Sequence, residues 1–208
     1  FLLQQANKVV VFTVAGVSAE SGVPTFRDAL SGLWAQYDPM QLATPEAFLR
    51  DPSLVWGWYE WRRKLLLEVR PNPAHLAIAC LQERVPQLTL ITQNVDDLHE
   101  QAGSRDVLHL HGSLFAARCF DCATPHELTA TPAGHGDREE PPTCSRCHGR
   151  VRPGVVWFGE SLPEQALETA FAAAKNCDLL LAVGTSGVVQ PAAQIPAMAL
   201  AAGATLVH

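Results

Sequence analysis

Several features that would place a protein in a special class are missing from this 208-residue sequence. It has no run of 18 or more apolar residues, so a membrane-spanning helix is not expected. The first residues, FLLQQANKVVVF, carry neither a basic segment nor a small-residue cleavage site, so we expect no secretory signal. They also lack an initiator methionine, and we expect the numbering to begin inside a longer natural chain.

Basic residues are not in excess either. The 15 Lys and Arg stand against 21 Asp and Glu, which gives a net charge of −6 and argues against a nucleic-acid groove. The rest of the composition, 48% hydrophobic and 17% charged, is typical of a soluble globular protein. The length allows one large domain or one domain with an insert. Without a secretory signal we expect a cytoplasmic protein, no membrane partner and no nucleic-acid partner.

Continuous apolar runs alternate with helical periodicity along the chain. Buried strands are predicted at 8–16, 87–94 and 177–186, with the start of another at 203–208. Helices are predicted between them at 73–85, 163–176 and 190–203. Unbroken Val and Leu runs are typical of strands covered on both faces, and the alternation of strand and helix predicts a doubly wound parallel α/β sheet. Ligands in such sheets bind outside the carboxyl ends of the strands.

Two stretches interrupt this alternation. Residues 29–72 carry turn signals and an apolar helix that contains YEWRR, and residues 113–154 contain two cysteine pairs and a loop rich in Pro and Gly. The sequence therefore predicts one α/β domain with two inserts.

The cysteine pairs CFDC and CSRC have the spacing C-x2-C-x21-C-x2-C, formed by Cys119, Cys122, Cys144 and Cys147. Four thiolates satisfy tetrahedral Zn²⁺ and leave no position for water, so this pattern predicts one structural zinc site. The alternative is two unrelated pairs of reduced thiols. A zinc ribbon alone would also be compatible with an interaction module. Cys80 and Cys177 lie in apolar segments, and we expect both to be small buried residues.

A glycine-rich turn follows the first predicted strand. Val14, Gly16 and Ala19 stand where a dinucleotide fingerprint would read G-x-G-x-x-G/A, so the first glycine is replaced. A β-branched residue is unfavourable at positive φ. Either the turn has negative φ at Val14, or the chain binds a dinucleotide more weakly than a Val14→Gly variant would.

Five motifs occur in one order around the four cysteines: AGVSAESGVPTFRD (15–28), TQNVDDLHEQAG (92–103), LHLHGS (108–113), VVWFGE (155–160) and GTS (184–186). In this respect the sequence resembles the sirtuins, NAD-dependent protein lysine deacylases, over nearly its whole length. The resemblance implies a Rossmann-like NAD domain and a smaller lobe made of a zinc ribbon and a helical insert. The acyl-lysine would enter between them, and the products would be lysine, nicotinamide and 2′-O-acyl-ADP-ribose.

The resemblance also implies domain bounds. Residues 1–28, 73–112 and 155–208 would form the NAD-binding domain, lacking its last strand and helix; residues 29–72 would form the helical insert with the acyl pocket; residues 113–154 would form the zinc module.

His111 matches the catalytic base of the family, and a neutral imidazole is suited to accept a hydroxyl proton near pH 7. Considered alone, His111 would be a structural histidine, as we expect His75 and His99 to be. Asn94 is the second residue matched to catalysis. The other residues matched to the NAD site are Ala15, Gly16, Ser18, Ala19, Glu20, Phe26, Arg27, Gln93, Val95, Asp96, Gly184, Thr185 and Ser186. Strand-end capping by Asn and Asp, and a surface charge at Arg27, are the alternatives for this set.

The substrate side is matched by VVWFGE, a segment that would pair with the peptide backbone as an added strand. Its members are Val156, Trp157, Phe158, Gly159 and Glu160, of which Trp157 and Phe158 would line the tunnel for the lysine stem. A plain buried strand is the alternative.

Tyr59 and Arg62 are three residues apart in the predicted insert helix and therefore share one face. An acetyl group needs no arginine, whereas a carboxylate fits the guanidinium fork. The resemblance agrees, because this pair, with Ala43 as a small pocket residue, marks the sirtuin branch (class III) that acts on succinyl- and malonyl-lysine. The alternative is a plain deacetylase in which Arg62 extends to solvent. Arg63 and Lys64 are expected on the charged side of this helix.

Overall fold

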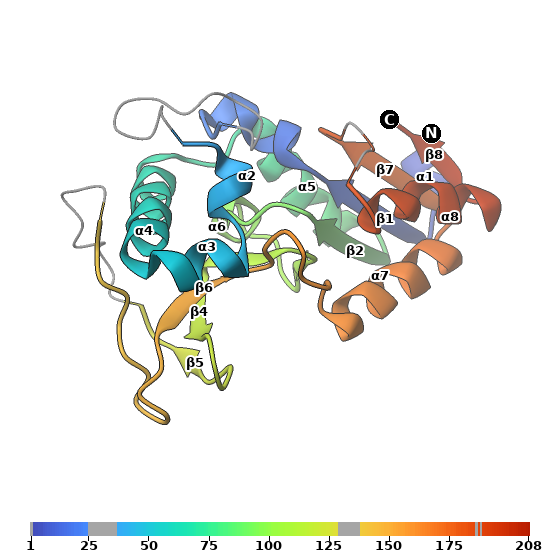
Figure 1. The fold of residues 1–208 in the computed structure, drawn as a ribbon. Coiled ribbons are helices and arrows are strands. Elements are labelled where there is room, and N and C mark those ends of the chain that lie inside the picture. Colours follow the sequence, from blue (N-terminus) through green and yellow to red (C-terminus); the bar gives the residue numbers. More distant parts are fainter. Residues whose placement is uncertain (1, 25–36, 129–137, 186, 188) are drawn as a thin grey trace. The chain divides into compact units, whose positions relative to one another are not determined.

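The computed structural model describes residues 2–24, 37–128, 138–185, 187 and 189–208, and its chain divides into two compact units (Figure 1). Unit 1 consists of Phe1–Thr25, Arg70–His111 and Leu162–His208. Unit 2 consists of Phe26–Val69 and Gly112–Ser161, and so takes in residues from both predicted inserts.

Unit 1 is built on a five-stranded sheet with the strand order β3-β2-β1-β7-β8. The strands are β1 (Lys8–Thr13), β2 (Gln87–Thr92), β3 (Leu108–His109), β7 (Leu179–Val183) and β8 (Thr205–Val207). Every neighbouring pair is parallel, and the register places Thr13 of β1 opposite Thr92 of β2. The predicted parallel sheet is therefore confirmed.

Both faces of this sheet are covered, as the continuous apolar runs predicted. Helices α7 (Glu164–Asn176) and α8 (Ile195–Ala201) cover one face, and α5 (Pro73–Arg84) covers the other (Figure 1). Val10 and Phe12 of β1 pack in a cluster with residues of α7 and α8, whereas Val9 and Val11 pack with α5. Successive side chains of a strand point to opposite faces, so one short strand contributes to two cores. The other helical elements in the described residues of unit 1 are α1 (Leu2–Gln5), η1 (Ala15–Ser21), α6 (Leu98–Gln101) and η3 (Ala192–Gln194).

Local chemistry decides where the helices begin. At the start of α5 the Asn72 side chain accepts hydrogen bonds from the backbone N–H of Ala74 and His75, and the His75 ring nitrogen Nδ1 accepts one from the Asn72 N–H. This reciprocal cap, with Pro73 at the first helical position, satisfies donors that a helix leaves unpaired. The helix predicted at 190–203 is shorter in the structure because α8 begins at Ile195, after η3, with proline in its first turn.

The described residues of unit 2 form three α-helices and a small antiparallel sheet. The helices are α2 (Pro39–Leu42), α3 (Pro45–Arg50) and α4 (Pro52–Glu68), and each begins at proline after a capping side chain, Asp38, Thr44 and Asp51 in turn. The strands are β4 (Gly112–Cys119), β5 (Pro125–His126) and β6 (Val151–Val155), in the order β5-β4-β6. Trp56 of α4 packs against Ala117 of β4 and Val151 of β6.

Cys177 is buried, as predicted, but the prediction for Cys80 is wrong because its side chain is exposed on α5. The apolar residues around Cys80 belong to an amphipathic helix, and Cys80 lies on the outer side of it. Over the described ranges, no helix combines the length and the apolar character needed to cross a membrane.

Candidate functional site

The turn after β1 accommodates Val14 with ordinary backbone geometry. Val14 has φ −135° and ψ 178°, an extended conformation that suits a β-branched residue. Its N–H donates to the Val183 carbonyl at the end of β7, at 3.1 Å. The first of the two alternatives for Val14, a turn with negative φ, is therefore the correct one.

Gly16, at the second glycine position of the fingerprint, must be glycine for a steric reason. The Gly16 N–H donates to the Gly184 carbonyl at 3.0 Å, and a Cβ added to Gly16 would lie 2.7 Å from the Gly184 Cα. Gly184 itself has φ +67°, and a Cβ there would lie 2.2 Å from the Val17 nitrogen. Two backbones thus approach each other where the carboxyl ends of β1 and β7 lie side by side, which is the place where an open α/β sheet binds a phosphate-bearing ligand.

Buried polar side chains gather beside this turn. The Ser18 hydroxyl donates to Asp96 Oδ2 at 3.0 Å and accepts from Asn94 Nδ2 at 3.0 Å. Asp96 Oδ1 accepts from the Leu98 N–H, and burial raises the pKa of Asp96 despite these hydrogen bonds. The structure thus brings together three of the residues matched to the NAD site, Ser18, Asn94 and Asp96, although they come from two segments of the chain.

Two buried histidines extend this cluster. His75 Nε2 lies 3.4 Å from the Ser18 hydroxyl, and His99 Nε2 lies 2.9 Å from the Thr13 hydroxyl. The two imidazole rings pack edge to face, with their centres 4.8 Å apart. Burial lowers the pKa of both, that of His99 to about 4. Both are therefore neutral core residues near pH 7, as the structural role predicted for them requires.

His111, the predicted base, follows β3. Its Nδ1 lies 3.0 Å from the Gln93 carbonyl. A carbonyl can only accept, so Nδ1 carries the proton and the neutral ring presents the lone pair of Nε2. Nε2 has no hydrogen-bond partner among the described residues, and burial lowers the pKa of His111. A half-buried imidazole with an accessible basic nitrogen is the arrangement that a general base needs.

His109, two residues before His111, makes contacts that the sequence did not indicate. Its Nδ1 lies 3.1 Å from the Asn94 carbonyl and its Nε2 lies 2.7 Å from Glu100 Oε1. The two histidines therefore bind successive carbonyls of the residues that follow β2. The alternation in LHLH indicates that His109 and His111 point to the same side of an extended segment. The contact of His109 with Glu100 could not be inferred, because Glu100 lies on α6.

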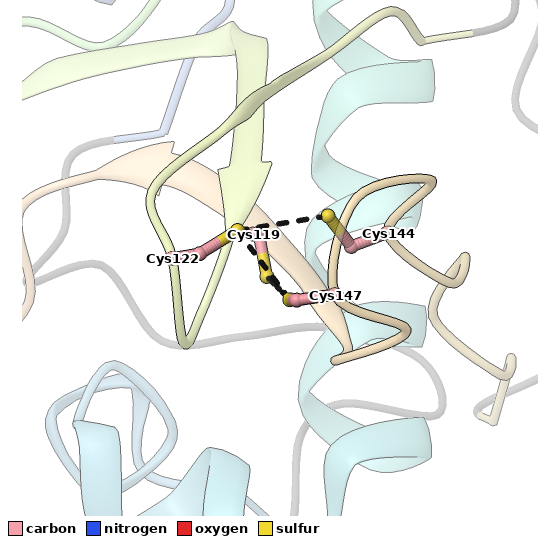
Figure 2. A group of neighbouring side chains, drawn as sticks. All are labelled: Cys119, Cys122, Cys144 and Cys147. Carbon is pink, nitrogen blue, oxygen red and sulfur yellow. Dashed lines mark hydrogen bonds between the residues drawn. The ribbon is translucent and has the colours of Figure 1, made fainter.

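The predicted metal ligands come together in unit 2. The four Sγ atoms of Cys119, Cys122, Cys144 and Cys147 lie within 4.8 Å of one another (Figure 2). Neighbouring sulfurs are 3.4–3.7 Å apart, close to the separation of about 3.8 Å that a tetrahedron with zinc–sulfur bonds of about 2.3 Å requires. The donor set therefore fits one structural Zn²⁺, and the predicted α/β fold with a smaller zinc-ribbon lobe is confirmed.

Backbone geometry supports this zinc site. The residues that follow each pair, Ala123 and His148, have φ of +56° and +63°, so both loops make the same left-handed turn after the second cysteine. Gly149 lies next, and a Cβ there would lie 3.3 Å from the Cys119 sulfur. His148 itself is exposed.

The predicted acyl-pocket residues also lie in unit 2. Tyr59 of α4 is 3% exposed, and its hydroxyl accepts a hydrogen bond from Trp157 Nε1 at 3.0 Å. Burial raises the pKa of Tyr59 to about 12, so the phenol remains protonated. Its own O–H has no acceptor among the described residues. Ala43, after α2, is 4% exposed and accepts a hydrogen bond from the Phe158 N–H at 2.9 Å.

Arg62 is half-buried on the same side of α4 as Tyr59. Its guanidinium carbon lies 5.1 Å from the centre of the Trp58 ring and 5.8 Å from that of Tyr59, within the range of cation–π attraction. Lys64 is exposed as expected, but the expectation for Arg63 is wrong: its side chain is buried and pairs with Glu60 at 2.6 Å on the same helix. The buried carboxylate of Glu60 explains this difference, because it compensates the charge of Arg63.

The VVWFGE segment differs from the predicted strand, since β6 ends at Val155 and residues 156–160 belong to no strand. Trp157 is 2% exposed and Phe158 is 43% exposed, so the two side chains have different environments. Arg152 holds the segment: its guanidinium lies 3.5 Å from the Trp157 ring centre and 2.9 Å from Glu160 Oε2. Glu160 Oε2 also accepts a hydrogen bond from the Trp157 N–H at 2.8 Å. Arg152, which sequence reasoning missed, therefore shapes this turn.

The remaining matched residues are surface positions or lie outside the described residues. Ala19 and Glu20 are exposed on η1, Ala15, Val95, Val156 and Thr185 are partly buried, and Gly159 has φ +87°. Phe26, Arg27 and Ser186 lie outside the described residues.

Comparisons with known proteins agree with this geometry. Residues 14–191 match the model of the Sir2 family. A relative from Pseudomonas aeruginosa, NAD-dependent protein deacylase 1, is 66% identical over 211 residues, covering 100% of this chain and 84% of the relative. A solved complex of a Sir2 homologue with NAD superimposes with a TM-score of 0.91 at 45% identity, covering 99% of this chain and 78% of that one. A Sir2 structure bound to an acetylated peptide gives a TM-score of 0.83 at 30% identity over 99% of this chain and 82% of that one. The chain belongs to the Sir2 family.

Proposed function

We propose that this protein removes acyl groups from protein lysines in an NAD-dependent reaction, that it favours acyl groups ending in a carboxylate, and that it also removes acetyl groups. The NAD dependence and the lysine substrate rest on the family and on the relatives named deacylases. The products would be nicotinamide and 2′-O-acyl-ADP-ribose. The cytoplasmic location predicted from the sequence is part of the same proposal.

Residues of unit 1 would bind NAD and move one proton. Bound NAD supplies the ribose that takes the acyl group. The turn at Gly16, beside the carboxyl ends of β1 and β7, would bind the phosphates. Ser18, Asn94 and Asp96 offer hydroxyl, amide and carboxylate groups to sugar hydroxyls and a carboxamide. His111 would accept a ribose hydroxyl proton at Nε2, because its Nδ1 proton is held by the Gln93 carbonyl.

The single observation that favours an acidic acyl group is the hydroxyl of Tyr59. It accepts from Trp157 but donates to no described group, although the residue is 3% exposed. A buried donor without an acceptor is unfavourable by about 1–3 kcal/mol. A substrate carboxylate would supply the acceptor, and the guanidinium of Arg62, stacked beside the Tyr59 ring, would supply the opposite charge.

The experiment compares kcat/KM for one peptide carrying either succinyl-lysine or acetyl-lysine, using the zinc-loaded protein and NAD. We expect the wild type to prefer the succinyl peptide. Arg62→Met should lower kcat/KM for it by about 100-fold, since charge-assisted hydrogen bonds worth roughly 3 kcal/mol are lost. The acetyl peptide should be affected far less.

Lys64→Met is the matched control, because Lys64 is an exposed cation on the same helix. Tyr59→Phe should lower the succinyl rate by a smaller factor than Arg62→Met. An acetyl preference that Arg62→Met leaves unchanged would contradict the acidic preference and support a plain deacetylase. Labelling of the peptide with ADP-ribose in place of lysine release would instead indicate an ADP-ribosyltransferase, and binding without NAD consumption an interaction module.

A further inference from the structure

His109 and His111 hold the residues that follow β2, here called the β2 loop (residues 93–97), at two successive carbonyls. His111 Nδ1 bonds to the Gln93 carbonyl and His109 Nδ1 to the Asn94 carbonyl, at 3.0 and 3.1 Å. The Gln93 and Asn94 N–H groups are also bonded, to the Thr13 carbonyl and the Thr92 hydroxyl. Hydrogen bonds thus hold the backbone N–H and carbonyl groups of both Gln93 and Asn94, in the loop that carries the proposed nicotinamide and ribose contacts.

The two histidines differ at the second ring nitrogen. His109 Nε2 lies 2.7 Å from Glu100 Oε1, whereas His111 Nε2 has no protein partner in the described parts of the chain. A carbonyl and an ionised carboxylate can only accept, so both nitrogens of His109 must carry a proton. Both contacts of His109 are therefore satisfied at once only when His109 is an imidazolium, whereas the single contact of His111 is satisfied by a neutral ring.

The charges around His109 agree with this assignment. Burial alone would lower the pKa of His109, but the hydrogen bond and charge of Glu100, with the Asn94 carbonyl and Asp96, raise it. Burial would raise the pKa of Glu100, but its hydrogen bond to His109 lowers it, so Glu100 is the anion of the pair. The other titratable neighbours are Asp97 on the β2 loop and His99 on α6, and the lowered pKa of His99 leaves that ring neutral.

We propose that His109 is a positioning residue: as an imidazolium held by Glu100, it fixes the Asn94 carbonyl and so keeps the β2 loop in the conformation that binds NAD. When His109 loses one proton, it can satisfy only one of its two partners, and the lone pair then faces either the carbonyl or the carboxylate. NAD affinity should therefore fall as the pH rises through the titration of His109. This inference rests on the proposed function, because it takes the β2 loop to be part of the NAD site.

The test is NAD affinity by calorimetry between pH 6 and 9 on the zinc-loaded protein. We expect the wild-type Kd to rise at the alkaline end. Glu100→Gln should move this rise to lower pH, because it removes the charge that holds the proton, and His109→Phe should raise Kd about tenfold at pH 6 and flatten the profile. A titration of the His109 ring protons by NMR should give a pKa above its ordinary value that decreases in Glu100→Gln.

Asp96→Ala separates this inference from the proposed function. If it leaves the NAD affinity unchanged, the NAD site has been assigned wrongly and the inference fails with it. If Asp96→Ala weakens NAD binding but the pH profile has the same shape in the wild type, Glu100→Gln and His109→Phe, only the positioning role is wrong. An NMR pKa of His109 at or below about 6.5 would overturn the imidazolium assignment directly.

Discussion

The turn between β1 and η1 shows how a single backbone angle changes an inference drawn from a motif. A missing glycine at position 14 suggests weak NAD binding only if that position needs positive φ. Val14 is extended at φ −135°, and its side chain packs against the core cluster of unit 1. The steric demand lies instead at Gly16 and Gly184, where added Cβ atoms would meet backbone at 2.7 and 2.2 Å.

We therefore expect Val14→Gly to leave the NAD affinity within about twofold of the wild type. The same change should lower the free energy of unfolding by about 1–2 kcal/mol, because glycine is more flexible in the unfolded chain and a partly buried side chain is lost. Calorimetry with NAD and urea unfolding check both parts.

Gly16→Ala is the comparison within the same turn. Its Cβ would meet the Gly184 backbone, which cannot rotate away as a side chain would, so NAD affinity or stability should fall clearly. A Val14→Gly protein that binds NAD tenfold more tightly than the wild type would contradict this account.

Single residues were predictable where a motif carried them and unpredictable where their partner was distant. The clustering of the four cysteines was predicted from a short motif, and the roles of His111 and Asn94 are proposals that rest on motifs of the same kind. The pairs Tyr59–Trp157 and His109–Glu100 join residues on different elements, and no sequence spacing indicates them. The prediction for Arg63 failed for a different reason. Its partner Glu60 lies only three residues away on the same helix, but the sequence does not show that this side of the helix is buried.

At the scale of elements, the long apolar strands and the helices between them were predictable because continuous burial leaves a clear pattern. β1, β2, β7, α5 and α7 lie within a few residues of their predicted bounds. The two-residue strand β3 and the turn at 156–160 were not predictable, because a short segment takes its conformation from its neighbours. Arg152 and Glu160 hold that turn through a pair spaced eight residues apart.

Cysteines of the proposed zinc site lie at or near the ends of strands in the antiparallel sheet of unit 2, so we expect zinc to stabilise this sheet. Cys119 ends β4, and Cys144 donates its N–H to the Gly149 carbonyl at the turn before β6. We expect one Zn²⁺ per chain. Cys144→Ser should lower the zinc content and the free energy of unfolding by several kcal/mol, because zinc binding to four thiolates stabilises only the folded state. Zinc analysis and chemical unfolding measure these effects.

Cys80→Ser is the matched control for this prediction. Cys80 is an exposed thiol of unit 1, outside the four-cysteine cluster, so its replacement should leave both zinc content and stability unchanged. Equal zinc content in Cys144→Ser and Cys80→Ser would show that the four cysteines are not the ligands.

For the molecule as a whole, buried histidines make stability depend on pH in opposite directions. His109 has a raised pKa, so its contribution is complete below about pH 6.5 and is lost as the pH rises through its folded pKa. His99 has a pKa lowered to about 4, so the unfolded chain binds its proton first as the pH falls below about 6.5. Stability contributed by a neutral His99 is therefore lost between about pH 6.5 and pH 4.

The size of the His99 effect can be estimated from the two pKa values. Between pH 7 and pH 5 the difference in proton binding corresponds to about 2 kcal/mol of unfolding free energy. We expect His99→Gln, which keeps a polar side chain beside Thr13, to lose about 2 kcal/mol less unfolding free energy over that range than the wild type. Urea unfolding at both pH values with zinc in excess measures the difference, since contributions from carboxylates and zinc ligands are common to both proteins. If the two proteins lose the same free energy, His99 is not the group whose protonation destabilises the fold, and His75, buried against it with a lowered pKa, is the next to replace.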